Sequence, residues 1–462
     1  MPATLFEKLW RQHRIADLGD GVALIAIDRV MLHERTGGVA LDSLSKSGRT
    51  VLAPGQAFAV MDHIVDTLPG RSDATKMPTG MAFITGTRAA AHAAGIGLFD
   101  LDDPRQGICH VISPEQGIVL PGVTLVCPDS HTGTQGAFGA LAWGIGSSEA
   151  EHALATGTLR VRKPRTMRIT VRGRLAAAVG AKDLALHIIA QVGSAGAQGH
   201  AVEFAGDGVA ALDIEQRQTL CNMATEMSAF CAIIAPDDVS ISALEGTPLA
   251  PTGAQWDQAV AAWRTLASDR DAAFDRDIAI DADEVAPMIS WGTSPQQSIP
   301  VTGTVPRGEA ETEANHRRAL AYMGLEAGEA LAGLRIDAAF IGSCTNSRLS
   351  DLRRAAAVVQ GRRVAEGIRA ICVPGSGAVK RAAEAEGIAD TLIAAGFEWR
   401  EPGCSMCFFA GGESFGLRER VVSTTNRNFE SRQGPETRTH IASPELVAAS
   451  AIAGRIVDPR EA

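Results

Sequence analysis

The sequence alternates short apolar runs with helical patterns, and this alternation limits the possible folds more than any other feature. Residues 22–27 (V-A-L-I-A-I) and 122–127 (G-V-T-L-V-C) have the composition of buried strands. Between them, residues 82–97 carry a helical pattern that stops at glycine. Strands that alternate with helices favour parallel sheets covered by helices. We therefore predict an α/β fold.

The chain has 462 residues, of which 45% are hydrophobic and 21% charged, and this composition is typical of globular domains. Its length suits about three domains of ordinary size. A basic, strand-like stretch at 163–173 marks the expected start of the second domain, and a looser segment at 245–256 precedes the third. We expect domains at 1–159, 160–275 and 276–462.

Polar motifs follow two of the apolar segments in the first third of the chain. They are Asp62 and His63 in M-D-H, and Asp129, Ser130 and His131 in C-P-D-S-H-T. The ends of parallel strands converge on the ligand crevice of an α/β sheet, so we expect these residues near a site. Neighbouring Asp and His have the composition of an acid–base dyad. Adjacent strand residues point to opposite faces, however, so the sequence does not fix which carboxylate pairs with which imidazole.

Two further segments combine apolar and polar residues. Residues 136–155 are rich in small side chains, and we expect a closely packed helical region there. Asn222 and Glu226 lie four positions apart and share one face if their segment is helical. Apolar residues surround Glu226 in sequence, which favours a buried carboxylate with a partner over a solvated one.

Three cysteines in the last third of the chain point to a metal centre. Cys344 lies in I-G-S-C-T-N-S-R, and Cys404 and Cys407 lie in P-G-C-S-M-C. A closed zinc site needs four ligands, and the remaining candidates, Cys372 and His440, do not form a second tight ligand pair. A zinc knuckle and a redox C-x-x-C pair are alternatives. Small flanking residues favour an iron–sulfur cluster with one iron open to substrate.

Arginines after the cysteines indicate an anionic ligand. Arg427 and Arg432 can each hold a carboxylate through the fork of the guanidinium group, whereas we expect Arg348 and Arg418 to be surface charges or caps. The formal net charge of −10 argues against nucleic acid as the main partner. An open iron beside two arginines is suited to the dehydration of a small hydroxy acid.

The cysteine pattern and the absence of long apolar runs indicate a cellular compartment. Eight cysteines spread irregularly through a long chain do not resemble a disulfide framework. Residues 1–13 mix charge into their apolar run, unlike a signal peptide, and no later stretch approaches the roughly 20 apolar residues of a membrane span. We expect a soluble cytoplasmic protein.

Taken together, the motifs resemble those of the aconitase family, in the same order along the chain. They are M-D-H, H-V-I-S-P-E-Q-G, D-S-H-T, C-N-M-A-T-E-M, I-G-S-C-T-N-S-R, V-P-G-S-G, G-C-S-M-C and S-T-T-N-R-N-F-E-S-R-Q-G. The resemblance covers residues 4–455 and is closest to the large subunits of 3-isopropylmalate dehydratases. It implies three α/β/α domains of the aconitase type around a central cluster site, without the swivelling fourth domain.

The resemblance also implies roles for individual residues. Cys344, Cys404 and Cys407 correspond to the ligands of one [4Fe-4S] cluster with an open iron. The proton-handling residues are Asp62, His63, His110, Asp129, His131 and Glu226, with Glu226 as the partner of His131; the substrate contacts are His33, Ser130, Arg427 and Arg432; and the polar groups around the cluster are Asn222, Asn346 and Asn426. The serine base of the family lies on the swivelling domain, so a small partner subunit is implied.

The implied reaction is the isomerisation of 2- and 3-isopropylmalate by dehydration and rehydration in leucine biosynthesis. Departures from the pattern of the leucine-pathway members flank the site: F-F-A-G-G-E follows G-C-S-M-C, and C-P-D-S-H-T and M-D-H-I-V-D occur. They leave open a related hydro-lyase for methylmalate, citraconate or dimethylmaleate. Two other classes are an iron-responsive nucleic-acid-binding protein, which the acidic charge opposes, and an electron-transfer module, which needs a fourth ligand.

Overall fold

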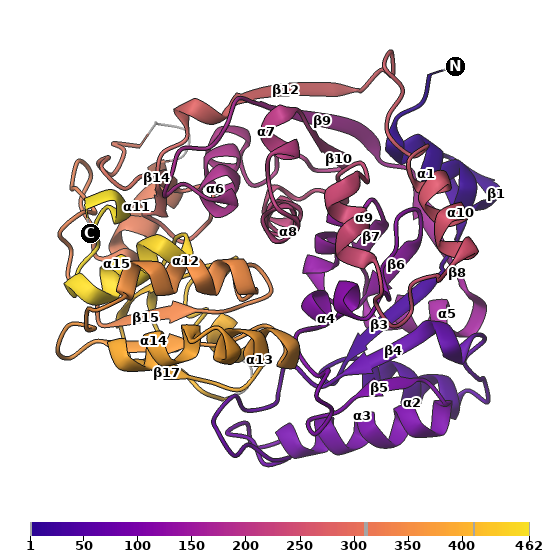
Figure 1. Cartoon of the computed structure of the whole chain (residues 1–462), viewed down its shortest axis with the longest axis horizontal. Coiled ribbons are helices and arrows are strands. Elements are labelled where there is room, and N and C mark those ends of the chain that lie inside the picture. The colour runs from indigo at the N-terminus through magenta and orange to yellow at the C-terminus, as the bar shows by residue number, and fades with distance from the viewer. Residues whose placement is uncertain (1, 309–312, 410–411, 462) are drawn as a thin grey trace. The chain divides into compact units, whose positions relative to one another are not determined.

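A computed structural model describes residues 2–308, 313–409 and 412–461 (Figure 1). The chain divides into two compact units, each assembled from separate stretches of sequence. Unit 1 consists of residues 1–62, 81–174 and 195–281, and unit 2 of residues 63–80, 175–194 and 282–462. Within the described part of the chain, no helix is both long and apolar enough to cross a membrane.

The first sheet of unit 1 carries the motifs of the first third of the sequence. Its five parallel strands lie in the order β5-β4-β3-β6-β7. The strands are β3 (Arg29–His33), β4 (Ala57–Val60), β5 (Gly97–Phe99), β6 (Thr124–Cys127) and β7 (Leu141–Gly144); the helices along this stretch are α2 (Gly37–Lys46), α3 (Gly80–Ala94), α4 (Cys109–Glu115) and α5 (Ser147–Thr156). Asp62 follows β4 and Asp129 follows β6, so both motifs come directly after parallel strands.

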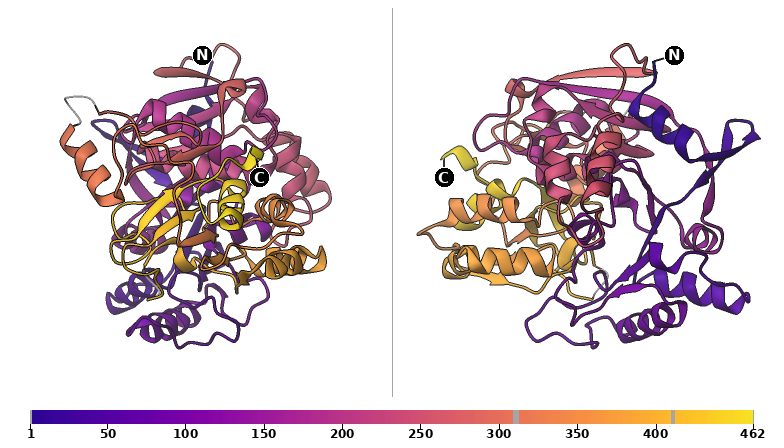
Figure 2. Two further views of the ribbon diagram at one scale, coloured as in Figure 1. Left: turned by 90° about the vertical axis from the view of Figure 1, so that its left-hand side faces the viewer. Right: turned by 45° about the vertical axis from the view of Figure 1, so that its right-hand side comes forward.

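Unit 1 also holds an antiparallel ribbon and a second parallel sheet. Figure 2 shows the ribbon in indigo, where β1 pairs with β2; β2 pairs in turn with β8. The second sheet has the order β11-β10-β9-β12. The bounds are α1 (Leu5–His13), β1 (Arg14–Gly19), β2 (Val22–Ala26), β8 (Thr158–Arg162), β9 (Arg165–Arg172), β10 (His200–Ala205), α7 (Asp207–Ala210), α8 (Ile214–Met223), β11 (Cys231–Ile233), α9 (Asp238–Leu244), α10 (Ala254–Trp263) and β12 (Arg276–Asp281).

Unit 2 is built on a third parallel sheet with the strand order β17-β16-β15-β18-β19. Its helix α12 packs against both α14 and α15, in the orange to yellow part of Figure 1. The bounds are α6 (Ala181–Val192), β13 (Met288–Ser290), β14 (Ser298–Pro300), α11 (Glu313–Met323), β15 (Ala338–Ile341), α12 (Leu349–Val359), β16 (Arg369–Cys372), α13 (Gly377–Ala385), α14 (Ile388–Ala395), β17 (Phe397–Trp399), β18 (Arg420–Ser423), β19 (Arg438–Ile441) and α15 (Pro444–Ala453).

The α/β fold with several parallel sheets is confirmed, and one local prediction is wrong. Residues 136–155 are only partly helical, because β7 occupies Leu141–Gly144 ahead of α5. Aliphatic strand residues and helix-forming small residues occur together there, and pairing with β6 decides in favour of a strand. The three-domain division stays a prediction: β12 begins at the expected boundary near 276 but pairs with β9 of the second sheet.

Candidate metal centre and acid–base residues

Cys344 lies in the turn that follows β15. A Cβ at Gly342 would come within 2.5 Å of the Phe340 ring, so the turn needs glycine there. Ser343 has a positive φ of 75°, which turns the chain sharply before the cysteine. The buried Arg348 guanidinium donates to the carbonyl oxygens of Cys344 and Thr345, at 2.7 and 2.9 Å. The expectation of a surface charge at 348 is therefore wrong, whereas the alternative of a local cap agrees with its place at the N-cap of α12 and its bonds to the preceding turn.

Cys404 and Cys407 are held in place by Met406, one of the two residues between them. Met406 is buried in the core of unit 2. Gln433 donates to the Met406 carbonyl at 2.5 Å, and Cys407 N donates to the Cys404 carbonyl at 3.0 Å. A single turn anchored by an apolar side chain thus holds both cysteines, which are 5% and 6% exposed.

Hydrogen-bond donors are directed at two of the three sulfur atoms. Cys407 Sγ lies 3.3 Å from Ser343 Oγ, 3.5 Å from Thr425 Oγ1 and 3.6 Å from Arg432 Nη2. Asn426 Nδ2 lies 3.5 Å from Cys344 Sγ. Donors directed at sulfur suit a thiolate that carries negative charge, as metal-bound cysteines do.

Four of the five remaining cysteines have strongly raised pKa values. Burial raises the pKa of the Cys109, Cys221, Cys231 and Cys372 thiols well above the ordinary value, which keeps them protonated and inert. His440 is also unsuitable as a ligand, because Nδ1 lies 2.7 Å from the Ser290 carbonyl and Nε2 lies 2.8 Å from Arg420 Nη1. Of the two candidates for a fourth ligand in unit 2, His440 therefore has both ring nitrogens engaged, and Cys372 is buried with a raised pKa.

The spacing of the three sulfur atoms bears on whether they could hold a single zinc ion. Zinc–sulfur bonds of about 2.3 Å in a tetrahedron bring sulfur atoms within about 4 Å of one another. Among the described residues, no set of three potential ligands mutually within 4.8 Å contains these cysteines. The three thiols are therefore not placed as ligands of one tetrahedral zinc ion.

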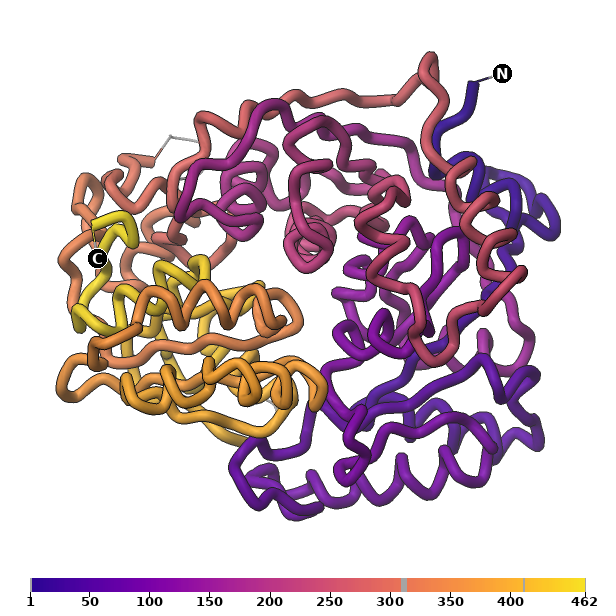
Figure 3. The backbone as a smooth tube through the Cα atoms, in the orientation of Figure 1, coloured from indigo at the N-terminus to yellow at the C-terminus, as the bar shows by residue number. Residues whose placement is uncertain are grey.

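A loop of unit 2 lies against the C-x-x-C turn. Figure 3 traces this segment, residues 63–79, from the end of β4 to α3. Thr67 Oγ1 donates to Ser405 Oγ at 2.8 Å, and Arg71 Nη1 donates to the Pro402 carbonyl at 2.5 Å. The same loop begins with His63, so these contacts anchor the segment that carries this predicted acid.

Aromatic rings flank one of the two predicted substrate arginines. The Arg432 guanidinium lies 4.9 Å from the Phe408 ring centre and 5.2 Å from that of Phe429. The Phe408 ring also lies edge-on to the His63 ring, at 6.1 Å. Arg427 and Arg432 are both partly exposed. Of the F-F-A-G-G-E segment, residues 410–411 lie outside the described residues.

In unit 1, the histidines and carboxylates form two pairs. His131 Nε2 lies 2.9 Å from Glu226 Oε1, and His110 Nε2 lies 2.9 Å from Asp129 Oδ1. Asp129 also accepts the His131 backbone N–H, at 2.7 Å. All four side chains are largely buried, whereas the neighbouring Ser130 is exposed. A carboxylate fixes the orientation of each imidazole, as proton transfer requires.

Close backbone approach positions these pairs. A Cβ at Gly136 would lie 1.6 Å from the Ala232 carbonyl oxygen, so β11 packs directly on the turn that contains His131. Asn222 donates to Thr134 Oγ1 in the same turn, at 2.8 Å. Asn222 lies in the last turn of α8, and Glu226 lies in the 3-10 turn that follows. The side chains of both nevertheless bond residues of the 131–134 turn.

The other predicted residues occupy buried polar positions. Asp62 accepts the backbone N–H of Cys109 at 2.8 Å, and its own N–H donates to Glu34 at 3.0 Å. Potential ligand atoms of His33, Glu34 and Asp62 lie within 4.8 Å of one another. In unit 2, Asn346 donates to Asp351 at 3.0 Å, a support for the cysteine-bearing turn. Sequence reasoning missed Glu34, which sits in M-L-H-E-R-T beside the predicted His33.

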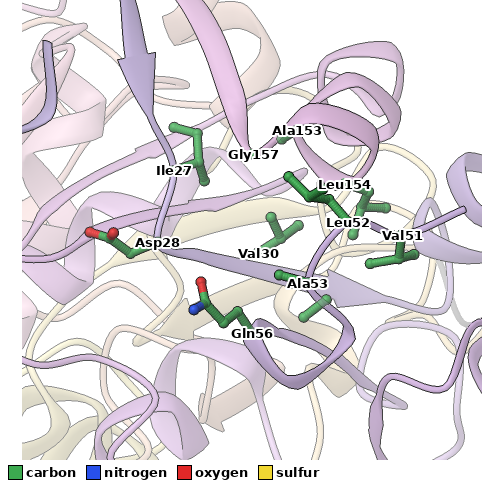
Figure 4. Close-up of a pocket in the computed structure, with 11 residues that line it drawn as sticks. Ile27, Asp28, Val30, Val51, Leu52, Ala53, Gln56, Ala153, Leu154 and Gly157 are labelled. Carbon is green, nitrogen blue, oxygen red and sulfur yellow. The ribbon is translucent and has the colours of Figure 1, made fainter. Parts of the chain in front are cut away.

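A small pocket of unit 1 lies apart from these motifs. Figure 4 shows Asp28 and Gln56 among aliphatic side chains. The pocket has about 20 Å³, the space of roughly one water molecule. Asp28 is already bonded to His13 and Thr124. The pocket is therefore a packing gap rather than a substrate site.

The fold is similar to that of aconitase X from Thermococcus kodakaraensis in its holo form, with 13% sequence identity, a TM-score of 0.50, and 93% of this chain and 90% of that chain covered. At this identity the likeness concerns the fold alone. The profile of the aconitase family (aconitate hydratase) matches residues 7–454. This chain belongs to the aconitase family.

Proposed function

We propose that this chain is the cluster-bearing large subunit of a 3-isopropylmalate dehydratase, which isomerises 2- and 3-isopropylmalate in leucine biosynthesis. The observation that carries the proposal is the three cysteines of unit 2, nearly buried, with donors directed at Cys344 and Cys407. The family assignment supports hydro-lyase chemistry. The resemblance of the motifs to those of 3-isopropylmalate dehydratase large subunits supports the choice of reaction.

In this proposal, Cys344, Cys404 and Cys407 hold one [4Fe-4S] cluster, which when bound supplies an open Lewis-acid iron for hydroxyl and carboxylate oxygens. Arg427 and Arg432 bind the substrate's other carboxylate. The Arg432 guanidinium is suited to this task because it is partly exposed and two aromatic rings beside it, at 4.9 and 5.2 Å, stabilise its charge and limit its motion.

Proton handling falls to the histidine–carboxylate residues. His63, which we propose Asp62 orients, gives a proton to the departing hydroxyl group. His131 keeps a fixed orientation through Glu226, and His110 through Asp129. The exposed Ser130 contacts substrate. The base that removes the carbon-bound proton comes from a small partner subunit, which also completes the pocket.

A second candidate is a related hydro-lyase for methylmalate, citraconate or dimethylmaleate, and Phe408 favours it. This ring directly follows Cys407 and contacts both His63 and Arg432, where the leucine-pathway pattern continues with leucine. A larger ring between the predicted acid and the carboxylate clamp suits a smaller apolar substituent on the substrate.

The cluster is tested by anaerobic reconstitution with ferrous iron and sulfide, followed by visible absorbance and turnover in the presence of the small subunit. Cys404→Ser should lose the broad visible absorbance and turnover together, whereas Cys231→Ala, in unit 1, should keep both. Turnover without the absorbance would refute the Lewis-acid role. Reversible one-electron cycling without turnover would indicate an electron-transfer module, and a salt-sensitive gel shift would indicate nucleic-acid binding.

The substrate is tested by comparing kcat/KM for 2-isopropylmalate, methylmalate and 2,3-dimethylmalate with the same complex. A preference of tenfold or more for isopropylmalate supports the first proposal. A preference for either smaller acid assigns the second candidate instead.

A further inference from the structure

Lys182, the second residue of α6 in unit 2, is a buried cation that the predicted reaction does not use. Its side chain is 1% exposed, and Nζ donates to the carbonyl oxygens of Thr424 and Thr425, at 2.8 Å each. Removing an ammonium group from water is costly unless it gains strong hydrogen bonds. A buried lysine here therefore indicates that its two hydrogen bonds to carbonyl groups have a structural or functional role.

The position of Lys182 is itself fixed. The next residue, Asp183, accepts the backbone N–H groups of Gly180 and Met288, at 2.9 and 2.8 Å. These bonds anchor the first turn of α6, so the lysine side chain starts from a rigid point of the fold.

The two carbonyl groups belong to the segment that follows β18, and this segment reaches both cysteine-bearing turns. Thr424 Oγ1 exchanges hydrogen bonds with the backbone of Gly342, at 2.9 Å in each direction. Thr425 Oγ1 lies 3.1 Å from the Cys407 carbonyl and 3.5 Å from its sulfur. Two adjacent residues thus connect the first cysteine-bearing turn to the second.

The segment also carries side chains of the proposed site. Asn426 Nδ2 lies 3.5 Å from Cys344 Sγ, and the next residue is Arg427. A shift in the backbone at 424–425 would move both side chains and the threonine donor to Cys407 together. The carbonyl groups held by Lys182 therefore control donors to two of the three thiolates.

We propose that Lys182 is a positioning residue of the cluster site, which holds the 424–427 segment ready before the cluster enters and places a positive charge behind the thiolates. This inference rests on the proposed function. A cation in a region of low dielectric favours the negatively charged, cluster-loaded state over the empty one. Lys182 itself touches neither substrate nor iron in this proposal.

The test follows loss of the cluster from the full chain, reconstituted with ferrous iron and sulfide and then challenged anaerobically with EDTA. Lys182→Met should lose its visible absorbance about tenfold faster than the wild type, since two charge-assisted hydrogen bonds are gone. Lys182→Gln, whose neutral amide keeps N–H donors but not the positive charge, should fall between them. Lys46→Met, at an exposed lysine paired with Asp42, is the matched control and should match the wild type.

Equal rates for a folded Lys182→Met and the wild type would overturn the inference. If the wild type binds no cluster, the proposed function fails instead, so the two failures are distinguishable. Backbone hydrogen exchange in the wild type gives a test that needs no variant. Residues 424–427 should be protected before reconstitution; protection that appears only after loading would show that the cluster orders the segment, and would overturn the role of Lys182.

Discussion

His440 offers a prediction whose size follows from the structure. Burial, with the nearby Arg420 and Arg438 charges, lowers the pKa of its imidazole from 6.5 to about 3. The folded protein therefore keeps His440 neutral at pH 5, whereas the unfolded chain takes up a proton there. Because the folded pKa lies below the unfolded one, this stabilisation is complete above pH 6.5 and is lost as the pH falls.

The linkage relation gives the magnitude. Between pH 7 and pH 5 this one group should lower the free energy of unfolding by about 2 kcal/mol, and the result barely changes if the folded pKa lies anywhere below about 4. Asp183 acts in the opposite direction, because burial and the nearby Glu445 raise its pKa to about 7 and stability then falls as the pH rises from about 4 to 7. The comparison must therefore be between variant and wild type, not along the wild-type curve alone.

The variant is His440→Asn, whose amide can still donate to the Ser290 carbonyl but cannot titrate. Urea denaturation at pH 7 and pH 5 should show that the variant lacks about 2 kcal/mol of the acid destabilisation of the wild type, although losing the acceptor for Arg420 lowers its stability at pH 7 by about 1–3 kcal/mol. His92→Asn, at an exposed position of α3, is the control.

Equal pH dependence in His440→Asn and the wild type would refute the picture of a sealed, neutral imidazole. The variant should also keep the visible absorbance of the cluster after reconstitution. Loss of that absorbance in a folded variant would mean that His440 is a ligand after all.

Three other perturbations have defined outcomes. Gly136→Ala places a methyl group on the Ala232 carbonyl and should destabilise unit 1 by about 3 kcal/mol in a thermal melt, whereas Gly86→Ala, with open space around its Cβ, should change the melting temperature little. Phe408→Leu removes one aromatic face from Arg432 and should raise KM for the dicarboxylate about fivefold with kcat nearly unchanged in steady-state kinetics. Chelation of iron should abolish turnover, and ferrous iron with sulfide should restore it; full turnover of an iron-free protein, by metal analysis, would contradict the cluster proposal.

Local patterns predicted the parts of the fold that depend on local sequence. The strand before Asp62, the helix that ends at Gly95 and the strand before Cys344 lie where apolar runs and glycine place them. Which carboxylate bonds which histidine depends on contacts between residues distant in sequence, so the sequence alone did not decide it. Asp129 lies beside His131 in sequence, yet its carboxylate bonds the His110 imidazole, because the following turn directs His131 toward Glu226.

The burial of two charged side chains was the other feature that the sequence pattern could not predict. Arg348 directly follows the N-S of the cysteine motif, and the usual expectation for an arginine there is solvent. Lys182 begins an otherwise ordinary helix. Both are buried because two loops present backbone carbonyl groups that need donors: the cysteine-bearing turn after β15, which Arg348 contacts, and the 424–425 segment after β18, which Lys182 contacts. Such a need becomes visible only when the turns are placed in space.

The same reasoning bears on why no fourth protein ligand would join the three cysteines of the proposed cluster site. Free histidine or thiol ligands near an iron would compete with substrate for its open position. Unit 2 holds two candidates for a fourth ligand. Cys372 is buried on β16 with a raised pKa, and both ring nitrogens of His440 are engaged in hydrogen bonds. In the proposed site, the open coordination position would then depend on how the surrounding strands use their polar groups, and a substitution that freed His440 should reduce activity before it reduces cluster content.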